Sequence, residues 1–319
     1  MSRTTFSLIL AAIVAGPLLS GCSPSQPAAT DANAAAVRPP APPADHPDVF
    51  RFKIGALDAV ALKDGDIEVP NDGKTFGVGR PVEDVAALLA SANLPTDSLR
   101  LSIQPLLVRN GPQVLLFDTG AGDASFARAG RLPASLRDAG VDPSQVSDIF
   151  LSHRHPDHTG GLLTREGALA FPNARIHLSA PEWEALKRDG DTALVAAIAP
   201  KVVAFQPGSE VLPGMVTSVA VEGHTPGHSA YEIASGGERL LYLGDTAHHY
   251  VISVQRPEWT VEYDENAPQA QASRRALLQR AAEGNLRIYA VHFPFPGLGR
   301  IKAKDSSFVW VPEGGELGD

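Results

Sequence analysis

Cysteine is almost absent from this chain of 319 residues, which contains only Cys22. One thiol cannot form an internal disulfide, and it excludes a zinc site built on several thiolates. Any metal must therefore be held by histidine and carboxylate side chains. Basic residues are also scarce, because 27 Lys and Arg stand against 36 Asp and Glu, for a net charge of −9. A chain with this net negative charge repels the phosphate backbone of a nucleic acid, so we expect no nucleic acid partner.

Extremes of composition are absent as well. Apolar residues make up 44% of the chain, charged residues 20% and aromatic residues 6%. These values exclude collagen, coiled coils and fully disordered chains, and they are typical of a globular protein.

The amino-terminal residues indicate export. The apolar run over residues 6–19 is too short to favour a membrane span, and small residues follow it, as in a signal peptide. The segment Leu19-Ser20-Gly21-Cys22 resembles a bacterial lipobox, which predicts a lipoprotein signal over residues 1–21 and lipidation of Cys22; the alternative is an incidental cysteine. We therefore expect secretion across the inner membrane and a lipid anchor on the periplasmic side of the cell envelope, with the choice of membrane open.

Residues 22–48 are predicted to form a disordered tether. They are rich in Pro and Ala and hold almost no large apolar side chain, so they cannot bury enough surface to offset their ordering entropy. Residues 49–319 remain for one folded domain, a size compatible with a single α/β core.

Apolar periodicity predicts strands alternating with helices in that domain. The segments 114–119 and 240–246 resemble each other, and each is followed by a strand that ends in a histidine, His153 or His292. This repeat predicts two sheets that face one another. The expected strands are 50–54, 59–62, 67–69, 100–108, 113–117, 146–151, 175–178, 202–205, 216–221, 229–233, 239–243 and 286–291, and the expected helices are 82–92, 132–139, 181–188 and 269–282.

The densest chemical signal is the segment SHRHPDHTGG at residues 152–161, directly after the predicted strand 146–151. Alternate side chains on extended backbone share a face, so its histidines and Asp157 can turn toward one point. Imidazole nitrogens and carboxylate oxygens are ligands for zinc and other first-row ions. The segment therefore predicts a metal site.

Three later residues extend this signal. His224 lies in a Gly/Pro-rich loop, while Asp245 and His292 each follow a buried strand. An ionised group at the end of an apolar strand is costly unless it is paired or liganded, so Asp245 calls for a cation.

The motifs HRHPDH, GHTPGH, LGD and VHFPFPG together resemble the metallo-β-lactamase superfamily. The last of them, with LVRNGPQVLLFDTGAG, is similar to its methyl parathion hydrolase-like branch. The resemblance implies an αββα sandwich, with two facing mixed sheets and helices on the outer faces, around a dinuclear centre. It assigns His153, His155 and His224 to the first metal, Asp157, His158 and His292 to the second, and Asp245 to both. It also implies that His228 is a neighbour and not a ligand, and that Asp118 braces the metal-binding loop.

Two divalent ions would acidify a shared water and supply a metal-bridging hydroxide. Zinc is the expected ion, and manganese, iron and cobalt are the alternatives. Asp157 is then placed to pass a proton to the leaving group. We expect hydrolysis of neutral esters or lactones, as in a lactonase or arylesterase. The alternatives are a phosphotriesterase, a weak β-lactamase, or a metal-binding envelope lipoprotein without activity.

Neutral substrates suit an apolar pocket. The relatives of this family suggest five wall residues, for which core packing is the alternative: Phe126, Trp183, Phe293, Phe295 and Leu298. For His248 and His249 the expectation is a place on the surface or behind the ligands, with a place facing the pocket as the alternative, and for His177 a place in the core. The sequence leaves the oligomeric state open.

Overall fold

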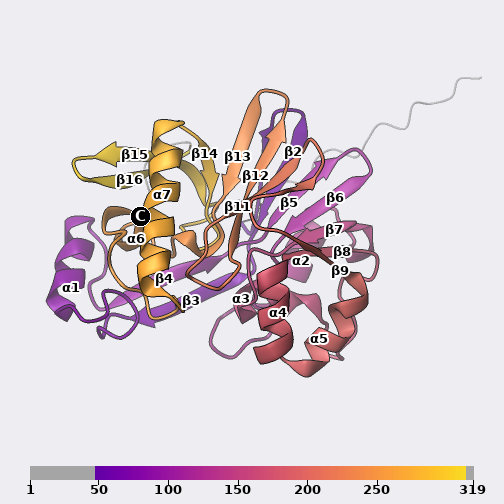
Figure 1. The fold of residues 1–319 in the computed structure, drawn as a ribbon, viewed down its shortest axis with the longest axis horizontal. Coiled ribbons are helices and arrows are strands. Elements are labelled where there is room, and N and C mark those ends of the chain that lie inside the picture. Colours follow the sequence, from indigo (N-terminus) through magenta and orange to yellow (C-terminus); the bar gives the residue numbers. More distant parts are fainter. Residues whose placement is uncertain (1–46, 314–319) are drawn as a thin grey trace, which may run out of the picture. The chain divides into compact units, whose positions relative to one another are not determined.

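The computed structural model describes residues 47–313 (Figure 1). The predicted signal, Cys22 and nearly all of the predicted tether lie outside these residues, so they stay predictions. Within residues 47–313, no helix combines the length and the apolar character that a membrane crossing requires.

The described chain contains two mixed sheets of seven strands each, in agreement with the predicted pair of mixed sheets. The strands β6 to β9 run parallel in the first sheet, and β13 and β14 run parallel in the second, while the other neighbours are antiparallel. The first sheet has the order β1 (Val49–Ile54), β2 (Leu57–Leu62), β5 (Leu106–Asn110), β6 (Gln113–Phe117), β7 (Asp148–Phe150), β8 (Arg175–Ser179), β9 (Val202–Phe205). The second has the order β10 (Glu210–Leu212), β11 (Val216–Ala220), β12 (Ser229–Ser235), β13 (Glu238–Tyr242), β14 (Arg287–Tyr289), β15 (Leu298–Lys304), β16 (Ser307–Pro312).

Aromatic side chains join the two sheets face to face. Phe117 and Phe150 of the first sheet stack with ring centroids 4.9 Å apart, and Tyr231 of the second meets Phe117 edge-on at 5.6 Å. The buried Tyr231 hydroxyl donates to the carbonyl of Leu151 at 2.6 Å, so its burial leaves no polar atom unpaired. This apolar layer confirms the predicted pair of facing sheets.

Helices cover the outer faces, which completes the αββα sandwich (Figure 1). Against the first sheet pack α2 (Leu132–Asp138), α4 (Ala180–Asp189) and α5 (Thr192–Ile198). The helix α7 (Ala267–Glu283) packs against the second sheet. The remaining α-helices of the described residues are shorter than α7: α1 (Val82–Ser91), α3 (Pro156–Thr159) and α6 (Ile252–Gln255). Local sequence starts α4, because the Ser179 hydroxyl accepts from the backbone N–H of Glu182 at 3.3 Å and Pro181 fills the first turn.

The predicted strand 100–108 is wrong, because it is two strands. Pro105 has no N–H to donate to a ladder, and the chain breaks at Gln104 and Pro105 between β4 (Ser98–Ile103) and β5. Only β5 forms the predicted hairpin with β6. β4 instead pairs with β3 (Gly65–Pro70) as a separate two-stranded ribbon. The helix α5 and the hairpin of β15 and β16 were not anticipated from the sequence.

Candidate metal centre

The carboxyl ends of parallel strands bring the chemistry-bearing residues together. The segment 152–161 follows β7, Asp245 follows β13, and His292 follows β14. The chain after Asp157 runs close to neighbouring backbone, as its two glycines predict. A Cβ on Gly160 would lie 2.3 Å from the Ala121 carbonyl oxygen, and one on Gly161 would lie 2.1 Å from that of Thr119. Larger residues would therefore displace the loop.

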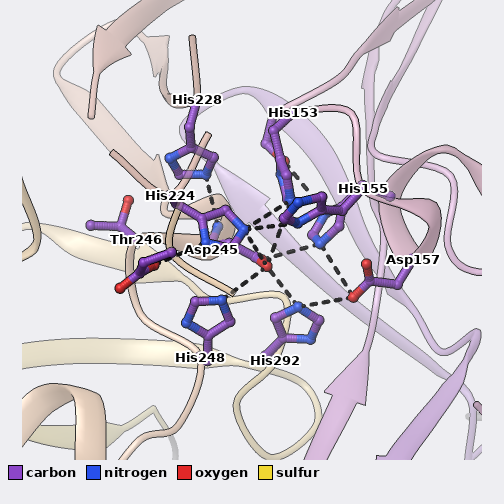
Figure 2. Close-up of polar contacts among 12 residues, drawn as sticks. His153, His155, Asp157, His224, His228, Asp245, Thr246, His248 and His292 are labelled. Carbon is purple, nitrogen blue, oxygen red and sulfur yellow. Dashed lines mark hydrogen bonds and ion pairs between the residues drawn. The ribbon is translucent and has the colours of Figure 1, made fainter. Parts of the chain in front are cut away.

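Seven side chains converge in two groups that share Asp245 (Figure 2). Within each group the candidate ligand atoms all lie within 4.8 Å of one another. The first group is His153, His155, His224 and Asp245, and the second is Asp157, His158, Asp245 and His292.

The two carboxylate oxygens of Asp245 face different groups. Oδ2 lies 3.7 Å from His153 Nε2 and 3.4 Å from His224 Nε2. Oδ1 lies 3.1 Å from His158 Nε2 and 3.0 Å from His292 Nε2. This is the placement expected of a residue shared by two cations.

Lone pairs in the first group point at one another. His224 Nε2 lies 3.2 Å from His153 Nε2 and 3.0 Å from His155 Nδ1. Burial holds the pKa of His153 well below its usual range and lowers that of His224 to about 3, so these rings are neutral. Among the described residues, His158 Nε2 and Asp245 Oδ1 are buried 3.1 Å apart without a well-formed hydrogen bond. Buried polar atoms of this kind are costly, and a divalent cation in the second group would satisfy both.

The second group holds two ionised carboxylates beside two histidines. Burial opposes charge there, yet Asp245 and Asp157 raise the pKa of His158 well above its ordinary value, and they raise that of His292 as well. Burial also favours the neutral form of Asp157, but His158 and His292 lower its pKa to about 2. The ionised carboxylates make this group a favourable place for a cation.

Hydrogen bonds behind the ligands fix their orientation. The carboxylate of Asp118 accepts from Ser152 N, Ser152 Oγ, His158 Nδ1 and the Tyr242 hydroxyl, each at 2.7 Å, which confirms its predicted bracing role. His292 Nδ1 donates to the carbonyl of Ser102 at 2.7 Å. A ring that donates through Nδ1 presents Nε2 to its group.

His228 supports the site without joining either group. Its Nε2 accepts from the backbone N–H of Asp245 at 2.9 Å, and its Nδ1 lies 3.1 Å from the carbonyl of Val221. Both ring nitrogens are thus engaged with backbone, in agreement with its prediction as a neighbour. The ring also explains the glycine before Asp245, since a Cβ on Gly244 would lie 2.6 Å from His228 Nε2.

A cavity of about 470 Å³ opens over the two groups. The β3–β4 ribbon supplies an apolar wall that includes Ile67, Val69 and Leu101, and Phe126 adds a ring that is 50% exposed. Residues of both groups, together with His248 and Tyr263, also line it. Phe126 thus borders this cavity, and its contact with a substrate stays a prediction.

The family profile described as Metallo-beta-lactamase superfamily matches residues 101–292, more than half of the chain. This protein belongs to the metallo-β-lactamase superfamily. That confirms the first resemblance noted in its sequence, whereas membership of the methyl parathion hydrolase-like branch stays a prediction.

Several known proteins are similar to this superfamily member. The solved structure of AidC, described as a dizinc quorum-quenching lactonase with a bound product, is 32% identical with a TM-score of 0.78, over 84% of this chain and 98% of its own. The hydrolase AbOPH, described as in the beta lactamase superfamily, is 27% identical with a TM-score of 0.76, over 86% of this chain and 100% of its own. The "Probable metallo-hydrolase" proteins of Mycobacterium bovis and Mycobacterium tuberculosis are 26% identical over 238 residues, 59% of this chain and 74% of theirs.

Four of the predicted wall residues of this metallo-β-lactamase superfamily member lie elsewhere. Trp183 packs on the outer core of the first sheet, with the Lys187 ammonium 5.5 Å from its ring centroid. Phe293 and Leu298 are buried in the cores, at 0% and 2% exposure. Phe295 lines a separate cavity of about 940 Å³, which Phe126 also borders. Core packing, the alternative reading, holds for Trp183, Phe293 and Leu298.

The expectation for His248 needs correction. Its ring is buried beside the site and lines the cavity, with Nε2 3.2 Å from Asp245 Oδ2. His248 lies beyond the 3₁₀ turn Gly244–Thr246, after the extended residue Ala247, so helical periodicity gave no signal of its place. His177 is a core histidine as expected, stacked on Phe150 and 2.8 Å from Asp148 Oδ1.

Tyr263 and Asp264 were missed altogether. Tyr263 borders the cavity, and the carboxylate Oδ1 of Asp264 lies 3.0 Å from His224 Nδ1. Both lie in a loop without a repeating pattern, so neither carried a signal in the sequence.

His249 is expected to make the fold acid-sensitive. Burial lowers its pKa from 6.5 to about 3, and its Nδ1 accepts from the N–H groups of Val251 and Ile252 at 3.3 and 3.2 Å. Because the folded pKa lies below the unfolded one, the neutral ring stabilises the fold above pH 6.5, and this stability is lost as the pH falls toward 3.

The substitution His249→Asn keeps an acceptor for both N–H groups and removes the titration. Urea unfolding at a series of pH values should show a slope shallower than that of the wild type by about 1.4 kcal/mol per pH unit below pH 6. Equal slopes for the two proteins would contradict this assignment.

Proposed function

We propose that this chain is a dinuclear metal-dependent hydrolase of neutral lactones and esters. The observation that carries the proposal is the shared Asp245, whose two oxygens face two ligand groups on the floor of a cavity with an apolar wall. The similarity to AidC, described as a dizinc lactonase, supports the lactone class. Apolar walls with a few polar groups favour an uncharged substrate over a charged one.

The first cation would be held by His153, His155, His224 and Asp245, and the second by Asp157, His158, His292 and Asp245. When bound, two such ions supply Lewis acidity and lower the pKa of water from about 15.7 toward about 7. Imidazole-rich ligand sets suit zinc, which is the ion we propose.

Asp157 is proposed to carry a proton during the reaction. Its Oδ2 lies 3.4 Å from His292 Nε2 and 3.5 Å from His158 Nε2, and its side chain lines the cavity. From this position its ionised carboxylate would be placed to accept a proton from the attacking water and return it to the leaving oxygen.

The substitution Asp157→Asn removes this acceptor while keeping the shape of the side chain. We expect turnover per bound metal to fall by about 10²-fold or more, the usual contribution of a positioned acid or base. Metal content and turnover are measured on the same samples. If turnover fell only in proportion to the metal lost, Asp157 would act as a metal ligand and not as a proton carrier.

A kinetic comparison of an acyl-homoserine lactone, phenyl acetate and a paraoxon-type triester tests the substrate class. The lactone and the aryl ester are expected to react far faster than the phosphotriester. A triester rate far above both would make phosphoryl transfer the main activity. A protein that holds its full metal content and is inert with all three would be a binding protein.

Phe126→Ala should weaken the binding of apolar substrates. The ring lies in the cavity wall, and burying an aromatic side chain contributes about 1.5–3 kcal/mol. We expect KM for an aryl ester to rise roughly tenfold, with a smaller change in kcat. Phe50→Ala is the matched control, because Phe50 is similarly exposed, at 42%, but lies on β1 and does not line the described cavity. Equal changes in KM for the two substitutions would show that Phe126 does not contact the substrate.

We also propose export and lipid anchoring through Cys22, on the signal-like sequence alone. Cys22→Ala should abolish incorporation of labelled fatty acid and move the protein from the membrane fraction to the soluble fraction. Retention of the label by the variant would overturn this proposal.

A further inference from the structure

A fully buried arginine lies behind the first ligand group. Arg274, on α7, is 1% exposed. Its Nη2 donates to Asp264 Oδ2 at 2.7 Å, its Nε donates to the carbonyl of Thr246 at 2.8 Å, and its Nη1 donates to the carbonyl of Pro257 at 3.0 Å. A buried guanidinium is costly unless its donors are paired in this way, so the arrangement is specific.

Two partners of Arg274, Asp264 and Thr246, lead toward the site. Asp264 uses its other oxygen, Oδ1, for His224 Nδ1 at 3.0 Å. Thr246 directly follows Asp245 in the 3₁₀ turn. The loop that carries Asp264 is also tied to the histidine's own backbone, because Glu265 N donates to the carbonyl of His224 at 3.1 Å. One guanidinium thus joins α7 to the segments that carry His224 and Asp245.

We propose that Arg274 and Asp264 are positioning residues for the first metal ion. The carboxylate of Asp264 holds the His224 ring with Nε2 toward His153 and His155, and Arg274 holds that carboxylate together with the backbone next to Asp245. This inference rests on the proposed function only in requiring that the two groups bind metal.

The second ligand group has different supports, so the effect should be confined to one ion. His158 is held by Asp118 at 2.7 Å and His292 by the Ser102 carbonyl at 2.7 Å. Neither of these contacts involves Asp264 or Arg274. Loss of Asp264 should therefore lower the affinity for one metal ion and leave the other nearly unchanged.

The chain contains a matched control for Asp264. Asp148 is also a buried carboxylate bound by a histidine and an arginine, with His177 Nε2 and Arg175 Nε each 2.8 Å from Oδ1. Its histidine belongs to neither ligand group of the described residues. Asp148→Asn therefore perturbs a buried carboxylate bound by a buried histidine and by the 56% exposed Arg175, outside both ligand groups.

The test is zinc release from the zinc-loaded full chain, titrated with a chelator of known affinity. In Asp264→Asn, one of the two ions should bind about 10–100-fold more weakly, the usual effect of removing a hydrogen-bond partner of a ligand histidine. In Asp148→Asn, both affinities should match the wild type. With cobalt as a second probe, the absorption spectrum of one ion should change in Asp264→Asn and that of the other should not.

Arg274→Lys keeps the charge but not the fork of donors, and it should weaken the same ion by a smaller factor. If Asp264→Asn does not fold, the zinc affinities of Arg274→Lys test the inference in its place. Unchanged affinities in Asp264→Asn, or equal weakening of both ions, would overturn the inference. A wild-type chain that binds no zinc would instead overturn the proposed function.

Discussion

Asp245→Asn is expected to lower hydrolysis by at least about 10³-fold. Metal ions supply several kcal/mol of transition-state stabilisation, and each 1.4 kcal/mol corresponds to a factor of ten in rate. The substitution removes the negative charge of a carboxylate whose two oxygens face different ligand groups, so it weakens both proposed sites at once. Turnover of an aryl ester and bound metal are measured together.

The control for this experiment is an exposed carboxylate. Asp123 forms a surface ion pair with Arg165 at 3.4 Å, where both side chains are largely exposed, so Asp123→Asn should leave turnover and metal content unchanged. If Asp245→Asn kept wild-type turnover with two ions bound, the shared carboxylate could not be essential to the reaction.

Removal of the metal should lower the melting temperature by at least about 8 °C. An ion present at 1,000 times its Kd stabilises the folded state by about 4 kcal/mol, and each kcal/mol is worth about 2 °C in a domain of this size. In the described site, His158 Nε2 and Asp245 Oδ1 form no well-aligned hydrogen bond, and without metal they would lose the ion that offsets their burial. Thermal unfolding before and after chelation, and after zinc is added back, measures the effect.

Asp245→Asn provides a second measurement for the same idea. If the stabilisation comes from ions held at this centre, chelation should shift the melting temperature of the variant much less than that of the wild type. A wild-type melting temperature that does not respond to verified metal removal would contradict the assignment of these residues as a metal centre.

Most of the site was accessible from the sequence because metal ligands come as dense, regular motifs. His153, His155, Asp157 and His158 lie within six residues of one another, and Asp245 and His292 each follow an apolar strand. A polar residue at such a position stands out against its surroundings. The alternation of strands and helices was equally readable, since it depends on local periodicity.

The supports behind the ligands were not accessible in the same way. Asp264 lies in an irregular loop and Arg274 on a helix, and only the packing of α7 against the second sheet brings them together behind His224. Trp183 illustrates the same limit. In α4 it is the neighbouring Glu182 that turns inward, where it accepts from the backbone N–H groups of Arg154 and Gly227 at 3.1 and 2.8 Å. Composition does not tell which side of a helix faces a site.

The β3–β4 ribbon has a further consequence for how this enzyme can change. Ile67 and Val69 line the metal cavity, Asp66 lines the larger cavity, and Glu68 borders both. Side chains along a strand alternate between its two surfaces, so an insertion or deletion of one residue before Ile67 would exchange Asp66 with Ile67. The Asp66 carboxylate would then be turned toward the metal cavity. We therefore expect lineages related to this chain to diversify here by substitution and by changes of two residues, with single-residue length changes confined to the flanking turns.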